Sequence, residues 1–149
     1  MAGNFDPTRP GFRLPTEVEW ECGCRSGTVT RFSYGSDPRL LNQYARSLDN
    51  PYSVKQAGIV AQLRPNLRGL FDMHGSALEW CNDFYNKYYS ASAITVGPAQ
   101  ESQRVLRGGG WFSVSDSCRS ASRAYSNPDS RNNGLGFRLC VTLRDNKQP

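Results

Sequence analysis

Residues 28–66 constrain the fold of this chain most, because they contain almost no regular hydrophobic pattern. They are rich in Gly, Pro, Asn, Asp and Ser, and only residues 30–34 and 58–60 look extended. Ordered loops of this length usually carry function or are pinned by a ligand. We therefore expect a core made of brief strands and loops around a few short helices.

Short apolar segments outside this stretch predict strands. Three of them are residues 70–73, 77–81 and 104–107. A fourth, residues 136–143, has the two-residue period of a half-buried strand. Its alternating apolar side chains are Phe137, Leu139, Val141 and Leu143. The predicted class is α+β, loop-rich, with short strands and few short helices.

The clearest predicted helix starts after Pro15. Thr16 followed by Glu19 is a capping-box pattern, so Thr16 is the expected N-cap. The helix should end near Gly23 or Gly27. The side chains expected on its buried side are Val18, Trp20 and Cys22.

Composition limits the possible functions. A chain of 149 residues, 38% hydrophobic and with seven Tyr and seven Phe, is normally one domain with a real core. The net charge of +5 is carried by fifteen Arg and three Lys that are scattered, so nucleic-acid binding is not favoured. Many of these arginines are expected to bind carboxylates and carbonyls, while weak attraction to acidic partners stays open. Apolar runs are too short for a membrane span.

The two ends of the chain and its cysteines give further expectations. Residues 1–10 have no apolar signal region, which favours a cytoplasmic protein or a fragment of a longer one. Five cysteines with no CxxC pair do not support a zinc site, and their odd number favours reduced, mostly buried thiols. These cysteines are Cys22, Cys24, Cys81, Cys118 and Cys140.

Four segments carry a family resemblance. They are RLPTEVEWE at 13–21, NLRGLFDMHGSALEWC at 66–81, RVLRGGGW at 104–111 and GLGFRL at 134–139. In this order and spacing they resemble the signature blocks of the formylglycine-generating enzyme (sulfatase-modifying factor) family. The resemblance implies a C-type-lectin-like fold. It assigns residues 13–143 to the domain, 1–12 to an N-terminal extension and 144–149 to a tail.

The resemblance covers only part of the family domain. Family members carry a comparable stretch before the first block, where this chain has about a dozen residues. The domain is therefore a minimal form, a truncated one, or one whose missing half comes from another chain. A homo-oligomer is a related possibility.

The glycine block and Glu79 carry specific structural expectations. Gly108–Gly110 before Trp111 predicts a close approach of the backbone or positive φ angles. Glu79 stands in an apolar stretch, so its carboxylate must be paired or bound to a cation. By resemblance, a structural calcium would be held by the Glu79 carboxylate and carbonyls at His74, Gly75 and Ala77. Ser76 replaces the family's Asn here, and an Arg partner for Glu79 is the alternative.

The family's catalytic cysteine pair is broken in this chain. The family enzyme oxidises a cysteine of sulfatases with two copper-binding cysteines that lie five residues apart, shortly after the glycine block. Counted without a gap, these positions fall on Ser113 and Cys118, and an alternative alignment places neither cysteine. We therefore predict no catalytic residues, with Cys118 a candidate only if the chain is a copper-dependent cysteine oxidase with an altered pair. His74, the single histidine, supports no catalytic triad.

Residues 111–134 have the composition of a recognition surface, with adaptable Ser and Asn and anchoring aromatic side chains. They also resemble the C-terminal variable region of retroelement-diversified proteins, which use the same scaffold. No Lys, Gln, Glu, Met or Trp occurs between Phe112 and Gly134, as that mechanism requires. An ordinary non-catalytic family member with a Ser-rich loop is the alternative. The predicted ligand-binding residues are Trp111, Phe112, Ser113, Ser115, Ser117, Ser122, Tyr125, Ser126, Ser130, Asn132 and Asn133.

The leading hypothesis is therefore a non-catalytic module that binds a protein or other ligand through residues 111–134. The copper-dependent oxidase is the enzymatic alternative. A structural half-domain completed by another chain is the third.

Overall fold

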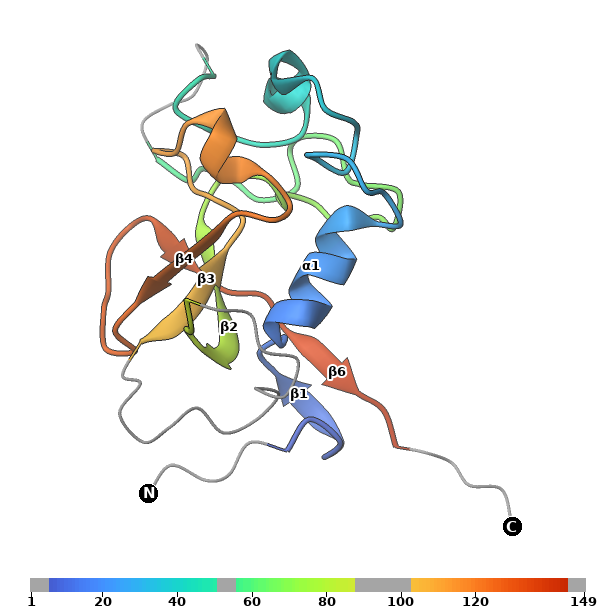
Figure 1. Ribbon diagram of the computed structural model, residues 1–149, viewed down its shortest axis with the longest axis vertical. Helices are drawn as coiled ribbons and strands as arrows, with labels where there is room; N and C mark the ends of the chain where they lie inside the picture. The colour runs from blue at the N-terminus through green and yellow to red at the C-terminus, as the bar shows by residue number, and fades with distance from the viewer. Residues whose placement is uncertain (1–5, 51–55, 88–102, 145–149) are drawn as a thin grey trace.

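The computed structural model describes residues 6–50, 56–87 and 103–144. Its strands are β1 (Gly11–Arg13), β2 (Leu78–Phe84), β3 (Arg104–Arg107), β4 (Arg123–Ser126), β5 (Leu135–Gly136) and β6 (Cys140–Thr142). Its helices are α1 (Glu17–Arg25) and the 3₁₀ helices η1 (Pro38–Gln43) and η2 (Ser115–Cys118). The predicted class, α+β with short elements, is confirmed (Figure 1).

The strands form two small sheets. One has the order β4-β3-β2-β5, in which β5 is parallel to β2 and the other pairs are antiparallel. The other is the antiparallel ribbon of β1 and β6. Figure 1 shows α1 beside the larger sheet, with the ribbon below it and the loops around η1 above it. No helix among the described residues is long and apolar enough to cross a bilayer.

Helix α1 has the predicted capping box. The Thr16 hydroxyl accepts from the Glu19 N–H at 3.2 Å, and the Glu19 carboxylate accepts from the Thr16 N–H at 2.8 Å. The helix ends at Arg25, and its C-cap Ser26 has a left-handed φ of 53°, so the end near Gly27 is confirmed.

The predicted buried side of α1 is wrong for Val18 and Cys22, which are exposed, and right for Trp20. The buried positions are Glu17, Trp20 and Cys24, which share one stripe of the helix. A charged residue could join this stripe because the Glu17 carboxylate pairs with Arg123.

Two of the predicted strands are observed. Residues 104–107 form β3, and the segment that starts at 77 forms β2 from Leu78 onward. Residues 70–73 form no strand. Both backbone groups of Leu70 bond to Asn66, and Asp72 has a φ of 60°, so this segment closes a loop instead of pairing with a neighbour.

Of the strand predicted at residues 136–143, the structure has β6 at Cys140–Thr142, and Gly136 belongs to β5. The alternation of side chains is real, but its apolar side is exposed instead of buried. Phe137, Leu139, Val141 and Leu143 are all exposed, while Arg138 between them is directed inward and binds Glu79. Successive residues of an extended chain point to opposite faces, so fixing Arg138 inside turns the whole apolar set outward.

The core has two parts. Trp20, Cys24, Met73, Cys81 and Val105 pack between α1 and the larger sheet. Phe32, Leu41, Ala45 and Cys118 pack beneath the loops. Tyr34 stacks on Phe32 and on Tyr44, with ring centroids 5.1 and 4.2 Å away. The loops of residues 28–50 are therefore held by a small aromatic core of their own.

Candidate functional site

The glycine block brings the loop after β3 close to the core. Gly108 and Gly109 have φ angles of 96° and 73°, as the sequence predicted. A Cβ on Gly109 would lie 2.7 Å from the Cys118 Sγ, and one on Gly108 would lie 3.0 Å from the Trp20 ring. The missing Cβ atoms thus let residues 111–118 fold back over β3 and place η2 at the surface.

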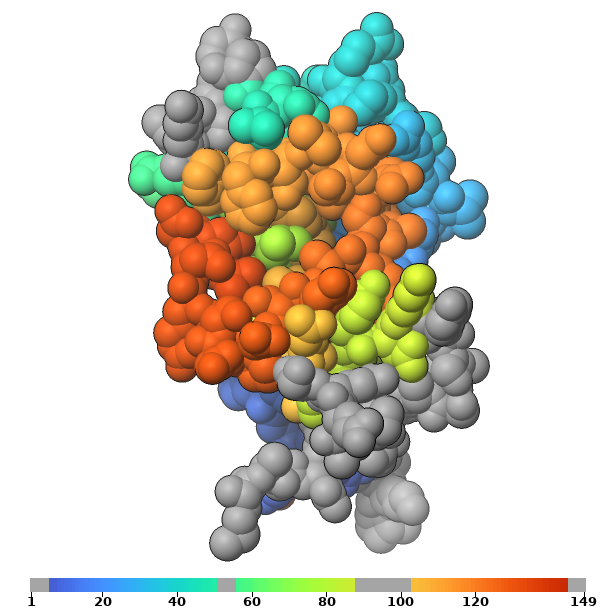
Figure 2. All heavy atoms as spheres, turned by 60° about the vertical axis from the view of Figure 1, so that its left-hand side comes forward, coloured from blue at the N-terminus to red at the C-terminus, as the bar shows by residue number. Residues whose placement is uncertain are grey.

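A cleft of about 540 Å³ lies beside this loop. Its lining includes the apolar residues Leu78 and Leu106, Gly109, and the serines Ser113, Ser117 and Ser122. All three serines belong to the predicted ligand-binding set. Figure 2 shows that the segments after β3, coloured orange to red, gather over this face of the molecule.

A second group of predicted residues is aromatic. The rings of Trp111 and Phe112 meet edge to face, with centroids 5.5 Å apart. The Trp111 indole N–H donates to the Asn133 carbonyl at 3.4 Å, which joins the two ends of residues 111–134. Phe112 keeps 42% of its surface exposed although its ring fits against Gly110 and Gly134. It offers an anchored aromatic contact.

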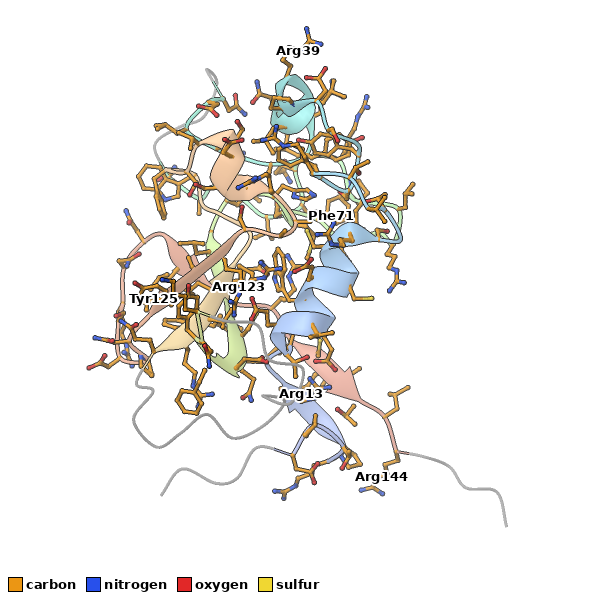
Figure 3. The ribbon with its side chains drawn as sticks, viewed as in Figure 1. Arg13, Arg39, Phe71, Arg123, Tyr125 and Arg144 are labelled. Carbon is orange, nitrogen blue, oxygen red and sulfur yellow. The ribbon has the colours of Figure 1, made fainter. Side chains whose placement is uncertain are left out.

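The third group lies on and after β4. Tyr125 is half exposed and packs on Tyr85 with centroids 4.3 Å apart. Figure 3 shows Tyr125 near Arg123, its neighbour two positions back on β4. The hydroxyls of Ser126 and Ser130 bond to each other at 2.9 Å. Tyr125 is the member of this group that can best meet a ligand.

Ser115 and Asn132, the remaining predicted residues, serve the loops themselves. The Ser115 N–H donates to the Asp49 carboxylate at 2.6 Å. The Asn132 side-chain oxygen accepts from the Gly134 N–H at 2.9 Å. The structure thus separates the predicted set into a serine-lined cleft, an aromatic group, a β4 group and two loop-stabilising residues.

Charged residues that the sequence analysis did not select also border the cleft. Asp116 and Arg119 line it, Arg119 donates to the Asp116 carbonyl at 2.7 Å, and Arg31 pairs with the Asp116 carboxylate. The sequence signal was the single acid between two serines at 115–117. Its partner Arg31 lies 85 positions away, so no local pattern could identify the pair.

Two ion pairs, each with one buried partner, lie beside the cleft, and one of them includes the lining residue Arg123. Glu17 accepts two bonds from Arg123, at 2.6 and 2.7 Å. Arg107 is fully buried, pairs with Glu21 and donates to the carbonyls of Ser120 and Ser122. These arginines are structural partners of carboxylates and carbonyls, as expected.

The Glu79 carboxylate is one partner of an ion pair. Its carboxylate accepts from the Arg138 guanidinium at 2.8 Å and from the Trp20 indole N–H at 2.7 Å. The Gly75 carbonyl accepts from the Ala77 N–H at 3.0 Å. No group of three or more His, Cys, Asp or Glu among the described residues could hold a metal. These contacts show the alternative expectation for Glu79, an Arg partner.

His74 is buried and its neighbours define its tautomer. The Ser33 N–H can only donate, and it reaches Nε2 at 3.0 Å, while the Cys118 carbonyl can only accept and lies 2.9 Å from Nδ1. The proton of the neutral ring is therefore on Nδ1. Burial lowers the pKa of His74 to about 4, against a weaker opposing effect of the Cys118 carbonyl. The ring is a structural link between two loops.

Cys118 is not presented as a reactive thiol. It is fully buried, and burial raises its pKa to about 12, so the thiol is protonated at neutral pH. Copper binding in the family needs a pair of cysteines, and the other family position holds Ser113. The residues present do not fit the copper site.

Comparisons with known proteins agree with this fold. The chain is 39% identical to the serine/threonine-protein kinase pkn1 of Chlamydia pneumoniae over 138 residues, 89% of this chain and 21% of that protein. It is 33% identical to the formylglycine-generating enzyme of Streptomyces coelicolor over 86% of this chain and 46% of that enzyme. Treponema denticola variable protein 1 superposes with a TM-score of 0.83 at 36% identity, over 93% of this chain and 50% of that protein.

These matches show the fold and the family. The chain spans half or less of the length of these relatives. The likeness to the variable protein confirms the C-type-lectin-like fold of the formylglycine-generating-enzyme type. The family model described as the sulfatase-modifying factor enzyme 1-like domain matches residues 1–143. The chain therefore belongs to the sulfatase-modifying factor enzyme 1-like family.

Proposed function

We propose that this chain is a non-catalytic binding module whose ligand contacts the serine-lined cleft and the neighbouring aromatic side chains. The observation that carries this proposal is the position of the predicted residues. Ser113, Ser117 and Ser122 line one cleft, and Phe112 and Tyr125 are exposed aromatics. Hydroxyls supply hydrogen bonds and rigid aromatics supply contact area at low entropic cost, which is the composition of evolved binding loops.

The way the loop is anchored supports a finer proposal, that the surface is diversified by a retroelement. Arg107 holds the carbonyls of Ser120 and Ser122, and the Ser120 N–H donates to the Arg31 carbonyl. These contacts use the backbone of the loop and leave its side chains out. Backbone anchoring of this kind tolerates different side chains, except where a side chain such as that of Asn132 itself holds the loop.

The buried Cys118 and the serine at the other family position support a non-catalytic role. The competing oxidase activity has a direct test. The chain, loaded with copper, is incubated with a cysteine-containing sulfatase peptide, and mass spectrometry follows formation of the aldehyde. We expect no turnover. Aldehyde production that is lost in Cys118→Ser would replace the binding proposal with the enzymatic one.

The binding surface is tested by selecting peptides from a displayed random library on the immobilised chain. Ser117→Tyr narrows the cleft, and Phe112→Ser and Tyr125→Ala remove the aromatic contacts. Each should weaken the selected peptides about tenfold. Val29→Ala and Leu67→Ala are matched controls, since both residues are exposed and outside residues 111–134. Equal losses in the control variants would place the binding surface elsewhere.

The diversified form is tested in the genome. We expect a reverse-transcriptase gene and an Asn-rich near-copy of codons 111–134 beside this gene. Sister genes that are invariant over these codons would refute diversification but would leave the binding proposal in place.

A further inference from the structure

The charged side chains that line the cleft differ in how far they are already paired. These side chains are Asp116, Arg119 and Arg123. The Arg123 guanidinium donates twice to the Glu17 carboxylate, at 2.6 and 2.7 Å. The Asp116 carboxylate pairs with Arg31. The charges of Arg123 and Asp116 are therefore balanced by partners within the protein.

Arg119 is exposed, and its only contacts within the described residues leave most of its guanidinium available. Its Nε donates to the Asp116 carbonyl at 2.7 Å, and no carboxylate in the described part of the chain pairs with it. The bond through Nε fixes the plane of the guanidinium and leaves the two terminal nitrogens, which form a flat pair of donors. Arg119 thus brings an unbalanced positive charge to the lining of the cleft.

The hydroxyls of the cleft divide in a similar way. The Ser113 hydroxyl accepts from a backbone N–H, and the Ser122 hydroxyl donates to the Asp116 carbonyl. The Ser117 side chain is exposed and makes no hydrogen bond to another described residue. Ser117 and Arg119 both line the cleft. The polar groups that the protein leaves for a ligand are therefore a hydroxyl and a cationic pair of donors.

Much of the remaining lining is apolar. It comes from Leu78, Leu106, Ala121 and Ala124. A cleft of about 540 Å³ is large enough to take a small ligand or a few side chains. The flat pair of nitrogens of an arginine matches the two oxygens of a carboxylate. The net charge of +5 also attracts acidic partners.

We propose that the cleft binds a peptide segment that carries an Asp or Glu side chain together with an aliphatic one. The carboxylate is held by the terminal nitrogens of Arg119 and by the Ser117 hydroxyl, while the aliphatic side chain packs against Leu78 and Ala124. This ligand class rests on the proposed function, because it is assigned to the same cleft. Arg119 was not among the ligand-binding residues predicted from the sequence, so it adds a charged contact to the serine and aromatic ones.

The test starts from peptides selected on the immobilised chain from a displayed random library. We expect Asp or Glu in most of the selected peptides. One acidic peptide is synthesised with an amidated C-terminus, both as selected and with the amide in place of the acidic side chain, and is titrated by calorimetry. Arg119→Gln and the neutral peptide should each lower the affinity about tenfold, and the two changes together should lower it little further, because they break the same contact.

The matched control is Arg64→Gln, which removes the same charge from an exposed arginine outside the lining of the cleft. A second variant, Asp116→Asn, removes the negative charge beside Arg119 and should strengthen binding of the acidic peptide. Circular dichroism checks that all three variants fold. Losses that add in the double change, or an equal loss with Arg64→Gln, would overturn the carboxylate contact at Arg119.

The outcomes also separate this ligand class from the binding module itself. Selected peptides that lack acidic residues, but lose affinity with Ser117→Tyr and Phe112→Ser, would overturn the acidic ligand and leave the binding surface in place. Tighter binding of a phosphoserine version of the peptide through Arg119 would replace the carboxylate with a phosphate. A library that yields no binder would overturn both proposals.

Discussion

Acidification should destabilise this protein through His74. The folded structure holds the neutral ring, with Nε2 accepting from the Ser33 N–H and Nδ1 donating to the Cys118 carbonyl. Protonation of Nε2 would point its N–H at the Ser33 N–H, so that two donors face each other in a site that is almost fully buried. The folded state therefore resists protonation, while the unfolded chain takes up a proton at the ordinary pKa of 6.5.

The sign and size follow from proton linkage. Below pH 6.5 the unfolded state binds a proton that the folded state does not, so stability falls as the pH falls from 6.5 to about 4, where the folded ring also titrates. Each pH unit in this window corresponds to about 1.4 kcal/mol, and the full window to about 3 kcal/mol. The Glu19 carboxylate affects stability at lower pH, because its bond to Arg13 reduces its pKa to about 2.

Two measurements check this prediction. Urea unfolding across the window should show a falling free energy of unfolding for the native chain and a flatter profile for His74→Gln, whose amide can donate and accept but does not titrate. Because His74 is the single histidine, proton NMR of an untagged sample reports its pKa directly. A ring that titrates near 6.5 in the folded protein, or parallel pH profiles for the two proteins, would refute the reasoning.

Three further predictions follow from other contacts. Arg138→Met should lower the free energy of unfolding by about 3–5 kcal/mol, because the buried Glu79 carboxylate loses its ionic partner. In urea titrations, adding Glu79→Leu to this variant should recover part of the lost stability. Additive losses of the two substitutions would disprove the pairing. Gly109→Ala should lower the free energy of unfolding by about 2 kcal/mol, because the φ at this position is left-handed and the new Cβ would approach Cys118. Gly27→Ala is the control, since Gly27 has a positive φ but open space around it, and thermal melting should show a smaller loss for this variant. Calcium or a chelator should leave the melting temperature unchanged, since Arg138 occupies Glu79; a calcium-dependent rise abolished by Glu79→Gln would show that the ion displaces the arginine.

Local patterns predicted the elements better than their orientation. The capping box at Thr16 and the close approach at Gly109 depend on neighbouring residues, and both were predicted. The buried side of α1 was predicted wrongly at Val18 because hydrophobicity alone cannot show that Glu17 has a partner. That partner, Arg123, is 106 positions away.

The strand at 140–142 was misjudged for the same physical reason. Periodicity shows that two sides of a strand differ, and the usual inference is that the apolar side is buried. Here the Arg138–Glu79 pair, 59 positions apart, decides the orientation.

The candidate site shows which parts of a binding surface a sequence can identify. Composition pointed to residues 111–134 as the binding surface, which stays a prediction, and it could not separate side chains that face the cleft from those that hold the loops. Ser113 and Ser122 do both, because the Ser113 hydroxyl accepts from the Gly110 N–H and the Ser122 hydroxyl donates to the Asp116 carbonyl. Phe112 and Ser117 are exposed beside them. If selection for new ligands acts on this surface, it meets the least structural resistance at these last two positions, because the side chains of Ser113 and Ser122 also hold the loop.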